Sequence, residues 1–255
     1  MIVCKSPAEI ERMRAANALV ADVLAELEAM VAPGVTTAEL DAAAEKLVRA
    51  GGAEPAFKGY KGYPGTLCAS VNEQVVHGIP SSRALVEGDI ISLDMGVKLN
   101  GFYGDSAVTV PVGRVSEAAA TLLQVTRESL EKGIAQVRLG GRVSDIGHAI
   151  QKHVEAYGLS VVREFVGHGI GAALHEEPQI ANYGEPGRGP RLAEGMTLAI
   201  EPMVNAGRPA VKVLADGWTA VTRDGSLSAH FEHTVAVTKG GPLVLTRRSV
   251  PAPAQ

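Results

Sequence analysis

Apolar residues recur at helical spacing over the first fifty positions, between signals that start and stop two helices. Ser6 can cap the first helix, Pro7 suits its first turn, and Pro33-Gly34 would end it. The stretch TTAE at 36–39 repeats the start signal, and Gly51-Gly52 would end the second helix. The pattern therefore predicts a pair of helices at the start of the chain.

Strand patterns follow at 55–112, where apolar and β-branched residues alternate with polar ones around SVNEQVVHGIP and an Asn100-Gly101 pair marks a hairpin turn. A helical pattern returns at about 116–138 and 145–157. After Gly158, strand patterns resume in the stretches VVREFVGHGIG, GMTLAIEPMV, WTAVTRDG and AHFEHTVAVT. The order of a helix pair followed by strands thus occurs twice.

The two halves also show a weak repeat in sequence. An offset of 107 residues superimposes Gly34 on Gly141, Thr37 on Ser144, Ala42 on Ala149, Leu47 on Val154 and Gly51 on Gly158. Halves at about 6–112 and 113–240 predict an α+β fold in which helices cover one face of a curved antiparallel sheet. We expect a single domain over residues 1–249, a site between its halves, and a disordered tail at 250–255.

Composition narrows the classes of partner and location. The chain has 255 residues, 46% of them hydrophobic and 20% charged, which is enough to fill a sizeable core. A net charge of −4 and a pI near 6.0 argue against a nucleic-acid surface or a basic membrane patch. Two cysteines, Cys4 and Cys68, with no signal peptide and no apolar membrane span, predict a cytoplasmic protein. Small molecules or peptides are the expected ligands.

Two aspartates lie within the apolar strands of the predicted hairpin. A two-residue turn at Asn100-Gly101 would pair Leu99 with Phe102, placing Asp94 opposite Ala107 and Asp105 one diagonal step away on the same face. Unpaired buried charge costs several kcal/mol, so the two carboxylates are expected to share a cation. The alternative is an exposed sheet face that carries two solvated aspartates.

The second half of the chain offers further ligands for a cation. His168 and His175 lie in the glycine-rich stretch GHGIGAALHEEP, and Glu201 and Glu232 lie within short apolar strands. Each alone is weak, because a histidine beside glycines is often structural and a strand glutamate often faces water. Together with the aspartates they form an oxygen-rich set that suits two divalent ions such as manganese, iron, cobalt or zinc. Such ions support hydrolysis.

These five positions, within the motifs VNEQVVHGIP, GHGIG, HEEP and IEPM, resemble the type I methionine aminopeptidases over nearly the whole chain. The resemblance implies a pita-bread fold of two pseudo-symmetric halves with a dinuclear metal site. It also implies removal of the initiator methionine from new proteins, and nascent-chain N-termini near the ribosome as partners of a monomer. Carried over residue by residue, the metal ligands are Asp94, Asp105, His168, Glu201 and Glu232.

The resemblance also assigns roles beside the metal. His175 would stabilise the scissile carbonyl and its oxyanion, and His77 would contact the backbone near the leaving amine. Glu201 would also carry a proton from the attacking water. The positions that line the methionine pocket in the family are Phe57, Tyr60, Tyr63, Cys68, Leu174 and Trp218.

The pocket departs from the family pattern, because relatives often have a small residue or cysteine where Phe57 stands and an aromatic residue where Leu174 stands. The bulk of the pocket is therefore redistributed, although aromatic rings and a thiol still suit a thioether. Ordinary core packing is the alternative role for the aromatic residues and for Cys68.

Other classes of protein share the fold. Prolidases, proline-specific aminopeptidases and creatinase carry a substantial N-terminal domain, for which a first helix beginning at Ser6 leaves no room. Type II methionine aminopeptidases insert a helical segment between two metal glutamates, whereas only thirty residues separate Glu201 from Glu232. A non-catalytic peptide-binding relative would have lost metal ligands that this chain retains. The ligand types do not identify the native metal.

Overall fold

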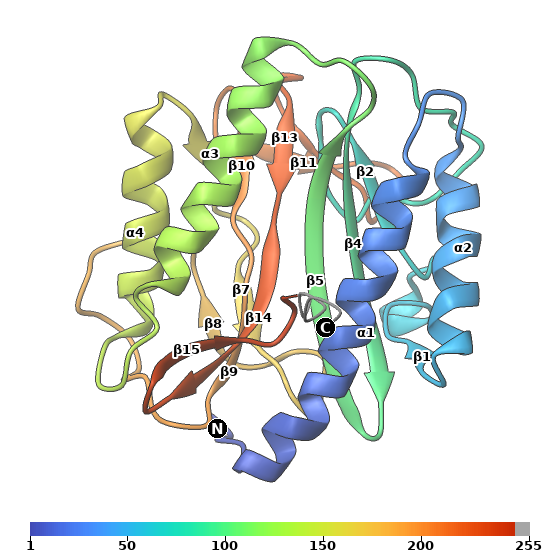
Figure 1. The fold of residues 1–255 in the computed structure, drawn as a ribbon. Coiled ribbons are helices and arrows are strands. Elements are labelled where there is room, and N and C mark those ends of the chain that lie inside the picture. The colour runs from blue at the N-terminus through green and yellow to red at the C-terminus, as the bar shows by residue number, and fades with distance from the viewer. Residues whose placement is uncertain (248–255) are drawn as a thin grey trace, which may run out of the picture.

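Helices cover one face of a curled antiparallel sheet in the computed structural model, which describes residues 1–247 (Figure 1). The helices are α1 (Pro7–Met30), α2 (Thr37–Ala50), α3 (Glu117–Ile134) and α4 (Val143–Ala156), with a short 3₁₀ turn η1 at Tyr60–Gly62. The α+β architecture is as predicted. The tail predicted at 250–255 lies outside the described residues, and the boundary between two halves stays a prediction.

The helix starts follow from capping side chains. The Ser6 hydroxyl accepts from the Glu9 amide at 3.4 Å, and the Glu9 carboxylate accepts from the Ser6 amide at 2.8 Å. Thr36 and Glu39 form the same reciprocal pair at 3.2 and 2.8 Å. Each pair satisfies backbone N–H groups that the first helical turn leaves without partners. Both predicted helix starts are confirmed.

The second helix pair differs from prediction at its inner ends. The helix expected to reach residue 138 ends at Ile134, after which the Val137 amide bonds the Ile134 carbonyl in a tighter turn. The next helix begins at Val143, two residues earlier than expected, because the Asp145 carboxylate accepts from the Arg142 amide at 2.8 Å and caps it there.

A nine-stranded sheet forms the centre of the molecule, in the order β1-β4-β5-β14-β9-β7-β8, with β2 paired to β4 and β15 to β14. Its strands are β1 (Glu54–Pro55), β2 (Cys68–Val71), β4 (Ile90–Leu99), β5 (Phe102–Pro111), β7 (Gly167–Gly169), β8 (Glu176–Ile180), β9 (Thr197–Ile200), β14 (Glu232–Thr238) and β15 (Gly241–Val244). Two three-stranded sheets, β13-β10-β6 and β11-β12-β3, adjoin it. Their strands are β3 (Gln74–Val76), β6 (Ser160–Val161), β10 (Met203–Asn205), β11 (Val211–Val213), β12 (Ala220–Thr222) and β13 (Ser228–His230).

The β4–β5 hairpin has the register that its turn predicts. Leu99 pairs with Phe102 and Asp94 with Ala107, so the two aspartates share one face of the sheet. Asn100 and Gly101 have φ values of 51° and 81°, the left-handed conformation that this two-residue turn requires and that asparagine and glycine tolerate best.

Three stretches that read as single strands are divided between sheets, one of them VVREFVGHGIG, which holds Val161 of β6 and the whole of β7. GMTLAIEPMV forms β9 and β10, which separate at Glu201-Pro202, where proline has no N–H to continue a ladder. AHFEHTVAVT forms β13 and β14, which separate at Phe231. Expecting continuous strands was therefore wrong, and the division places Glu201 and Glu232 at neighbouring junctions between the large sheet and a small one.

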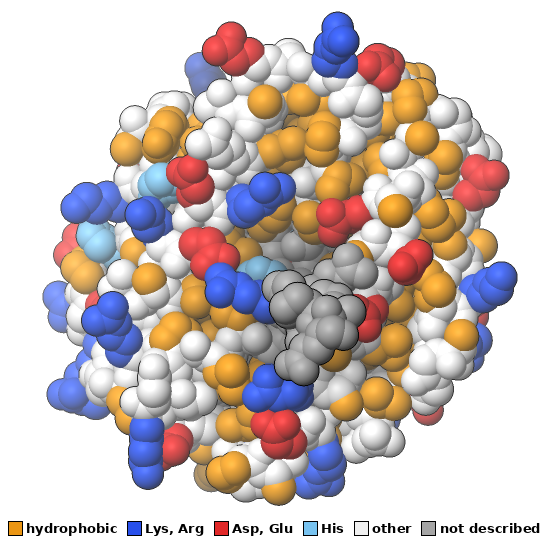
Figure 2. Space-filling model, in the orientation of Figure 1, with side chains coloured by type: hydrophobic (Ala, Val, Ile, Leu, Met, Phe, Trp, Pro, Cys, Tyr) orange, Lys and Arg blue, Asp and Glu red, His pale blue; other side chains and the backbone are white. Residues whose placement is uncertain are grey.

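Each helix pair covers its own buried apolar cluster. Val20, Leu27 and Leu40 of α1 and α2 pack over Leu93 of β4, while α3 and α4 pack over the strands of the second half. On the face shown in Figure 2, several basic side chains lie along the left edge, and elsewhere acidic and basic side chains are interspersed. Within residues 1–247, no helix is both long and apolar enough to cross a membrane.

Candidate metal centre

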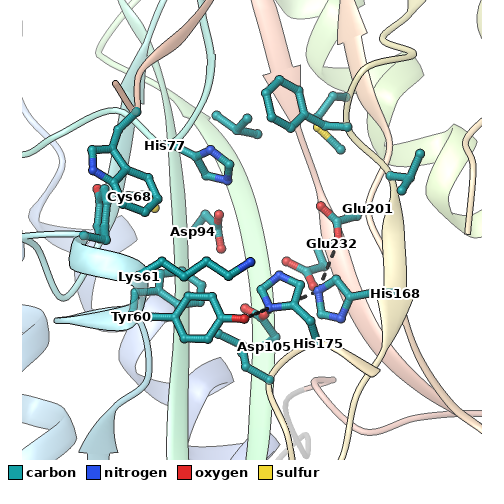
Figure 3. A pocket seen from close by; sticks show the side chains of 18 residues that line it. Tyr60, Lys61, Cys68, His77, Asp94, Asp105, His168, His175, Glu201 and Glu232 are labelled. Atoms are coloured by element: carbon teal, nitrogen blue, oxygen red, sulfur yellow. Dashed lines mark hydrogen bonds and ion pairs between the residues drawn. The ribbon is translucent and has the colours of Figure 1, made fainter. Parts of the chain in front are cut away.

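All the site residues predicted from the sequence line one pocket of about 220 Å³. Leu93 and Met95 of β4 belong to the apolar cluster under α1 and α2, so Asp94 between them points to the other face of the sheet. The pocket lies on that face, among strands from both parts of the chain (Figure 3). Its predicted members are Phe57, Tyr60, Tyr63, Cys68, His77, Asp94, Asp105, His168, Leu174, His175, Glu201, Trp218 and Glu232. Residues up to 175 positions apart therefore meet, as the prediction of a site between the halves requires.

Four carboxylates and one imidazole converge at the base of this pocket (Figure 3). Ligand atoms of Asp105, His168 and Glu232, all three buried, lie within 4.8 Å of one another. The Nε2 atom of His168 is 3.5 Å from Glu201 Oε1 and 3.9 Å from Asp105 Oδ2. Asp94 adds a fourth carboxylate from the neighbouring strand β4.

The backbone fixes which nitrogen of His168 faces the carboxylates. Its Nδ1 lies 2.8 Å from the Gly169 carbonyl, which can only accept, so Nδ1 carries the hydrogen. Burial lowers the pKa of His168 to about 4, so the ring is neutral at pH 7 and Nε2 keeps its lone pair. An imidazole held in this way is prepared to bind a metal ion.

The carboxylates oppose one another's ionisation. Burial raises the pKa of Asp94 to about 7, and burial together with the charges of Asp94 and Glu201 raises that of Asp105 well above its usual value. Burial and, to a smaller extent, repulsion from Asp94 raise the pKa of Glu201. Burial and, to a smaller extent, repulsion from Asp105 raise the pKa of Glu232. A positive charge among these groups would favour the ionised carboxylates and lower their pKa values.

The donor set fits divalent metal. Asp105 Oδ1 and Glu232 Oε1 are buried without a hydrogen-bond partner among the described residues. Buried polar atoms are normally paired, and carboxylate oxygens with one imidazole nitrogen are ligands that manganese, iron, cobalt and zinc accept. The site residues present are therefore suited to hold metal.

Two further histidines lie on different sides of the carboxylates (Figure 3). The Nδ1 atom of His175 is 3.0 Å from the Tyr60 hydroxyl, and the two rings stack with centroids 5.3 Å apart. Desolvation, followed by the Lys61 cation, lowers the pKa of His175. Across the pocket, burial lowers the pKa of His77 to about 4. The His77 and Phe165 rings are nearly perpendicular, with centroids 5.4 Å apart. Both rings are therefore neutral at pH 7.

Aromatic residues and a thiol form the opposite wall. The Tyr63 and Trp218 rings pack edge to face, with centroids 5.1 Å apart. The Tyr63 hydroxyl donates to the Gly78 carbonyl at 2.9 Å. This bond fixes the ring and leaves its surface toward the pocket. Burial, followed by repulsion from Asp94, raises the pKa of the Cys68 thiol, so the sulfur is uncharged and unreactive at pH 7. The wall is apolar and rigid.

Some pocket residues were not predicted from the sequence. They are Lys61, Val76, Phe165, Val166 and Met203. Each lies within three positions of a predicted residue, so proximity along the chain was the available signal. His230, buried beside the pocket, was also missed, and its Nε2 lies 3.7 Å from Glu201 Oε2.

Comparison with known proteins agrees with this geometry. The signature of metallopeptidase family M24 matches residues 11–239. The chain is 57% identical to methionine aminopeptidase 1 of Bacillus subtilis, over 97% of this chain and 100% of the relative. It resembles the crystal structure of a methionine aminopeptidase from Thermotoga maritima with a TM-score of 0.96 and 49% identity, over 97% of this chain and 100% of that one. A prolidase from Pyrococcus furiosus, 22% identical with a TM-score of 0.78 over 97% of this chain and 66% of the prolidase, shares the fold alone.

Proposed function

The chain belongs to metallopeptidase family M24 and, within it, to the methionine aminopeptidases, and from this premise we propose how its site works. The proposed reaction is hydrolysis of the first peptide bond of a protein that begins with methionine followed by a small residue. The observation that carries the proposal is the convergence of four buried or half-buried carboxylates and a preset imidazole beside an apolar pocket.

We assign two divalent metal ions to Asp94, Asp105, His168, Glu201 and Glu232. Four carboxylates balance two dications in charge, which supports two ions rather than one. Cobalt, manganese, iron or zinc would each be accepted. When bound, such ions lower the pKa of a water molecule and polarise a carbonyl group.

His175 would donate a hydrogen bond to the scissile carbonyl. If the Tyr60 hydroxyl donates to Nδ1, the neutral ring carries its hydrogen on Nε2, which is then free for the substrate. The same donor would stabilise negative charge that develops on the carbonyl oxygen. Tyr60 therefore sets the tautomer of His175 as well as its ring orientation.

Glu201 and His77 have the two remaining proposed roles. Glu201 would accept a proton from the attacking water, because its carboxylate lies among the metal ligands, with Oε1 3.5 Å from His168 Nε2. His77 lies across the pocket from His175 and would contact the backbone at the leaving amine (Figure 3). Neither His77 nor His175 has to bind metal in its proposed role.

The substrate side chain would lie against Tyr63, Trp218 and Cys68, with Phe57 and Leu174 closing the remaining wall. Aromatic rings and an uncharged sulfur make favourable contacts with a thioether. The second residue of the substrate would lie where the histidines approach the scissile bond, which leaves room for small side chains only. We propose that the substrates are nascent N-termini near the ribosome, met in the cytoplasm by a monomeric enzyme.

The direct test is release of free methionine from a Met-Ala peptide. Protein stripped of metal should be inactive, and addition of manganese, cobalt or iron should restore turnover. Absence of methionine release with every one of these metals, in protein shown by circular dichroism to be folded, would contradict the proposed function.

A further inference from the structure

A buried ion pair joins the first residues of the chain to the loop that carries His175. Lys5 Nζ contacts the Glu176 carboxylate, and the two side chains are only 4% and 12% exposed. The residues are 171 positions apart, so the contact is a long-range tie between the N-terminal segment and the start of β8. Buried ion pairs need further hydrogen bonds to offset desolvation, and both partners have them here.

The Lys5 end of the pair is anchored on the N-terminal side. Its ammonium also donates to the Val3 carbonyl at 3.0 Å, and its backbone amide donates to the Gly195 carbonyl at 2.6 Å. In Figure 1 the N-terminus accordingly lies beside the segment that leads into β9. Lys5 is therefore fixed before it meets the loop.

The Glu176 end organises the loop itself. The other oxygen of Glu176 accepts from the Ala173 amide at 3.1 Å, and the Gly171 amide donates to the Ala173 carbonyl at 3.1 Å. The Lys5 chain passes so close to Gly171 that a Cβ there would collide with Lys5 Cε. The loop at 171–176 is thus folded around the lysine, and it presents Leu174 and His175 to the pocket.

We propose that Lys5 and Glu176 are positioning residues that hold His175 in place for the reaction. The His175 ring is exposed to solvent, bonds the Tyr60 hydroxyl and packs on the His168 ring at a centroid distance of 4.3 Å, so the backbone of its loop decides whether these contacts form. A displacement of about 1 Å at a catalytic group can cost on the order of 100-fold in rate. This inference rests on the proposed function for its catalytic consequence, but not for the tie itself.

The tie is tested first without activity. In Lys5→Met, hydrogen exchange measured by mass spectrometry over residues 170–178 should be on the order of tenfold faster than in wild type. Glu176→Gln keeps the side-chain size and is the second variant, to be used if Lys5→Met folds poorly. Hydrogen exchange over residues 170–178 should be faster in it as well. The matched control is Lys239→Met, because the Lys239–Glu194 pair is 3.6 Å apart and 81% and 52% exposed. Exchange unchanged from wild type in both variants of the tie would overturn the inference.

The catalytic consequence is tested by a double-mutant cycle. Lys5→Met should lower kcat for a Met-Ala peptide about 10- to 100-fold with little change in KM, whereas Lys239→Met should leave both unchanged. In a His175→Ala background, adding Lys5→Met should change kcat less than about twofold, because the residue acts through the histidine. Multiplicative losses would overturn the positioning role. A wild-type protein that releases no methionine would refute the proposed function instead. The hydrogen-exchange measurement would still test whether the Lys5–Glu176 pair holds the loop.

Discussion

Replacing Asp105 by asparagine should make the metal-free protein more stable while abolishing its metal binding. Asp105 is buried, its Oδ1 has no hydrogen-bond partner among the described residues, and Asp94 and Glu201 repel its charge. An asparagine of the same shape removes that charge and supplies an N–H donor toward neighbouring carboxylates. Function and stability therefore oppose each other at this position.

The magnitude follows from the geometry. Ligand atoms of Asp105 and Glu232 lie within 4.8 Å, and two unit charges at about that distance repel by about 3.5 kcal/mol at an effective dielectric constant of about 20. Protons shared among the carboxylates reduce this, so we expect a gain of about 1–3 kcal/mol, or about 2–10 °C in Tm for a domain of this size.

The pH dependence has a definite sign. The folded pKa of Asp105 is raised above its ordinary value of 3.8, so its contribution to stability is present at acid pH and is lost as pH rises through the folded pKa. The advantage of asparagine should therefore grow as the pH rises above about 4, the ordinary value for an aspartate.

The assay is thermal unfolding of chelator-treated wild type and Asp105→Asn at several pH values. Asp224→Asn is a control of opposite sign, because backbone and hydroxyl bonds from Arg208 and Ser226 lower the pKa of Asp224 to about 2. A metal-free Asp105→Asn protein that is no more stable than wild type at pH 8 would refute the reasoning.

Three further predictions follow from the site. Metal binding should release more protons at pH 6 than at pH 8, because the raised pKa values of the carboxylates let protons compete with metal. Calorimetry in buffers of different ionisation enthalpy measures the number of protons released, and a value of zero would contradict this. The kcat/KM for peptides beginning Met-Ala should be about 10- to 200-fold higher than for those beginning Met-Lys, and peptides with an acetylated N-terminus should not be cleaved. Equal methionine release from Met-Ala and Met-Lys peptides would contradict the pocket assignment. Tyr60→Phe should lower kcat about tenfold and leave metal content unchanged, because the lost hydrogen bond to His175 is worth about 1.5 kcal/mol. An unaltered kcat would contradict the proposal that Tyr60 sets the tautomer of His175.

The β4–β5 hairpin could be predicted because its information is local. Turn type fixes register, so Asn100-Gly101 alone places Asp94 opposite Ala107. The capping pairs at Ser6 and Thr36 are similarly local, and both helix starts follow from them. That all the predicted site residues line one pocket required the family resemblance, because no local rule brings β5 beside β14.

Other features depend on tertiary packing. Periodicity does not reveal that Glu201-Pro202 and Phe231 are junctions between sheets, since the strands on both sides of each junction are largely buried and read as one continuous strand. The Lys5–Glu176 pair is equally hidden, because a lysine near a chain start is normally exposed. The tautomer of His168 depends on the Gly169 carbonyl, which backbone conformation alone directs.

The central claim is that metal ligands and peptide-contacting residues are distinct groups within one pocket. The measurement that separates them is metal content by mass spectrometry together with kcat for a Met-Ala peptide, in Asp105→Ala and His175→Ala. Asp105→Ala should lose metal and activity together, whereas His175→Ala should keep its metal and lose kcat by about 100- to 1000-fold, as for removal of an oxyanion donor. Equal loss of metal in both variants, or a loss of kcat below about tenfold in His175→Ala, would contradict the account.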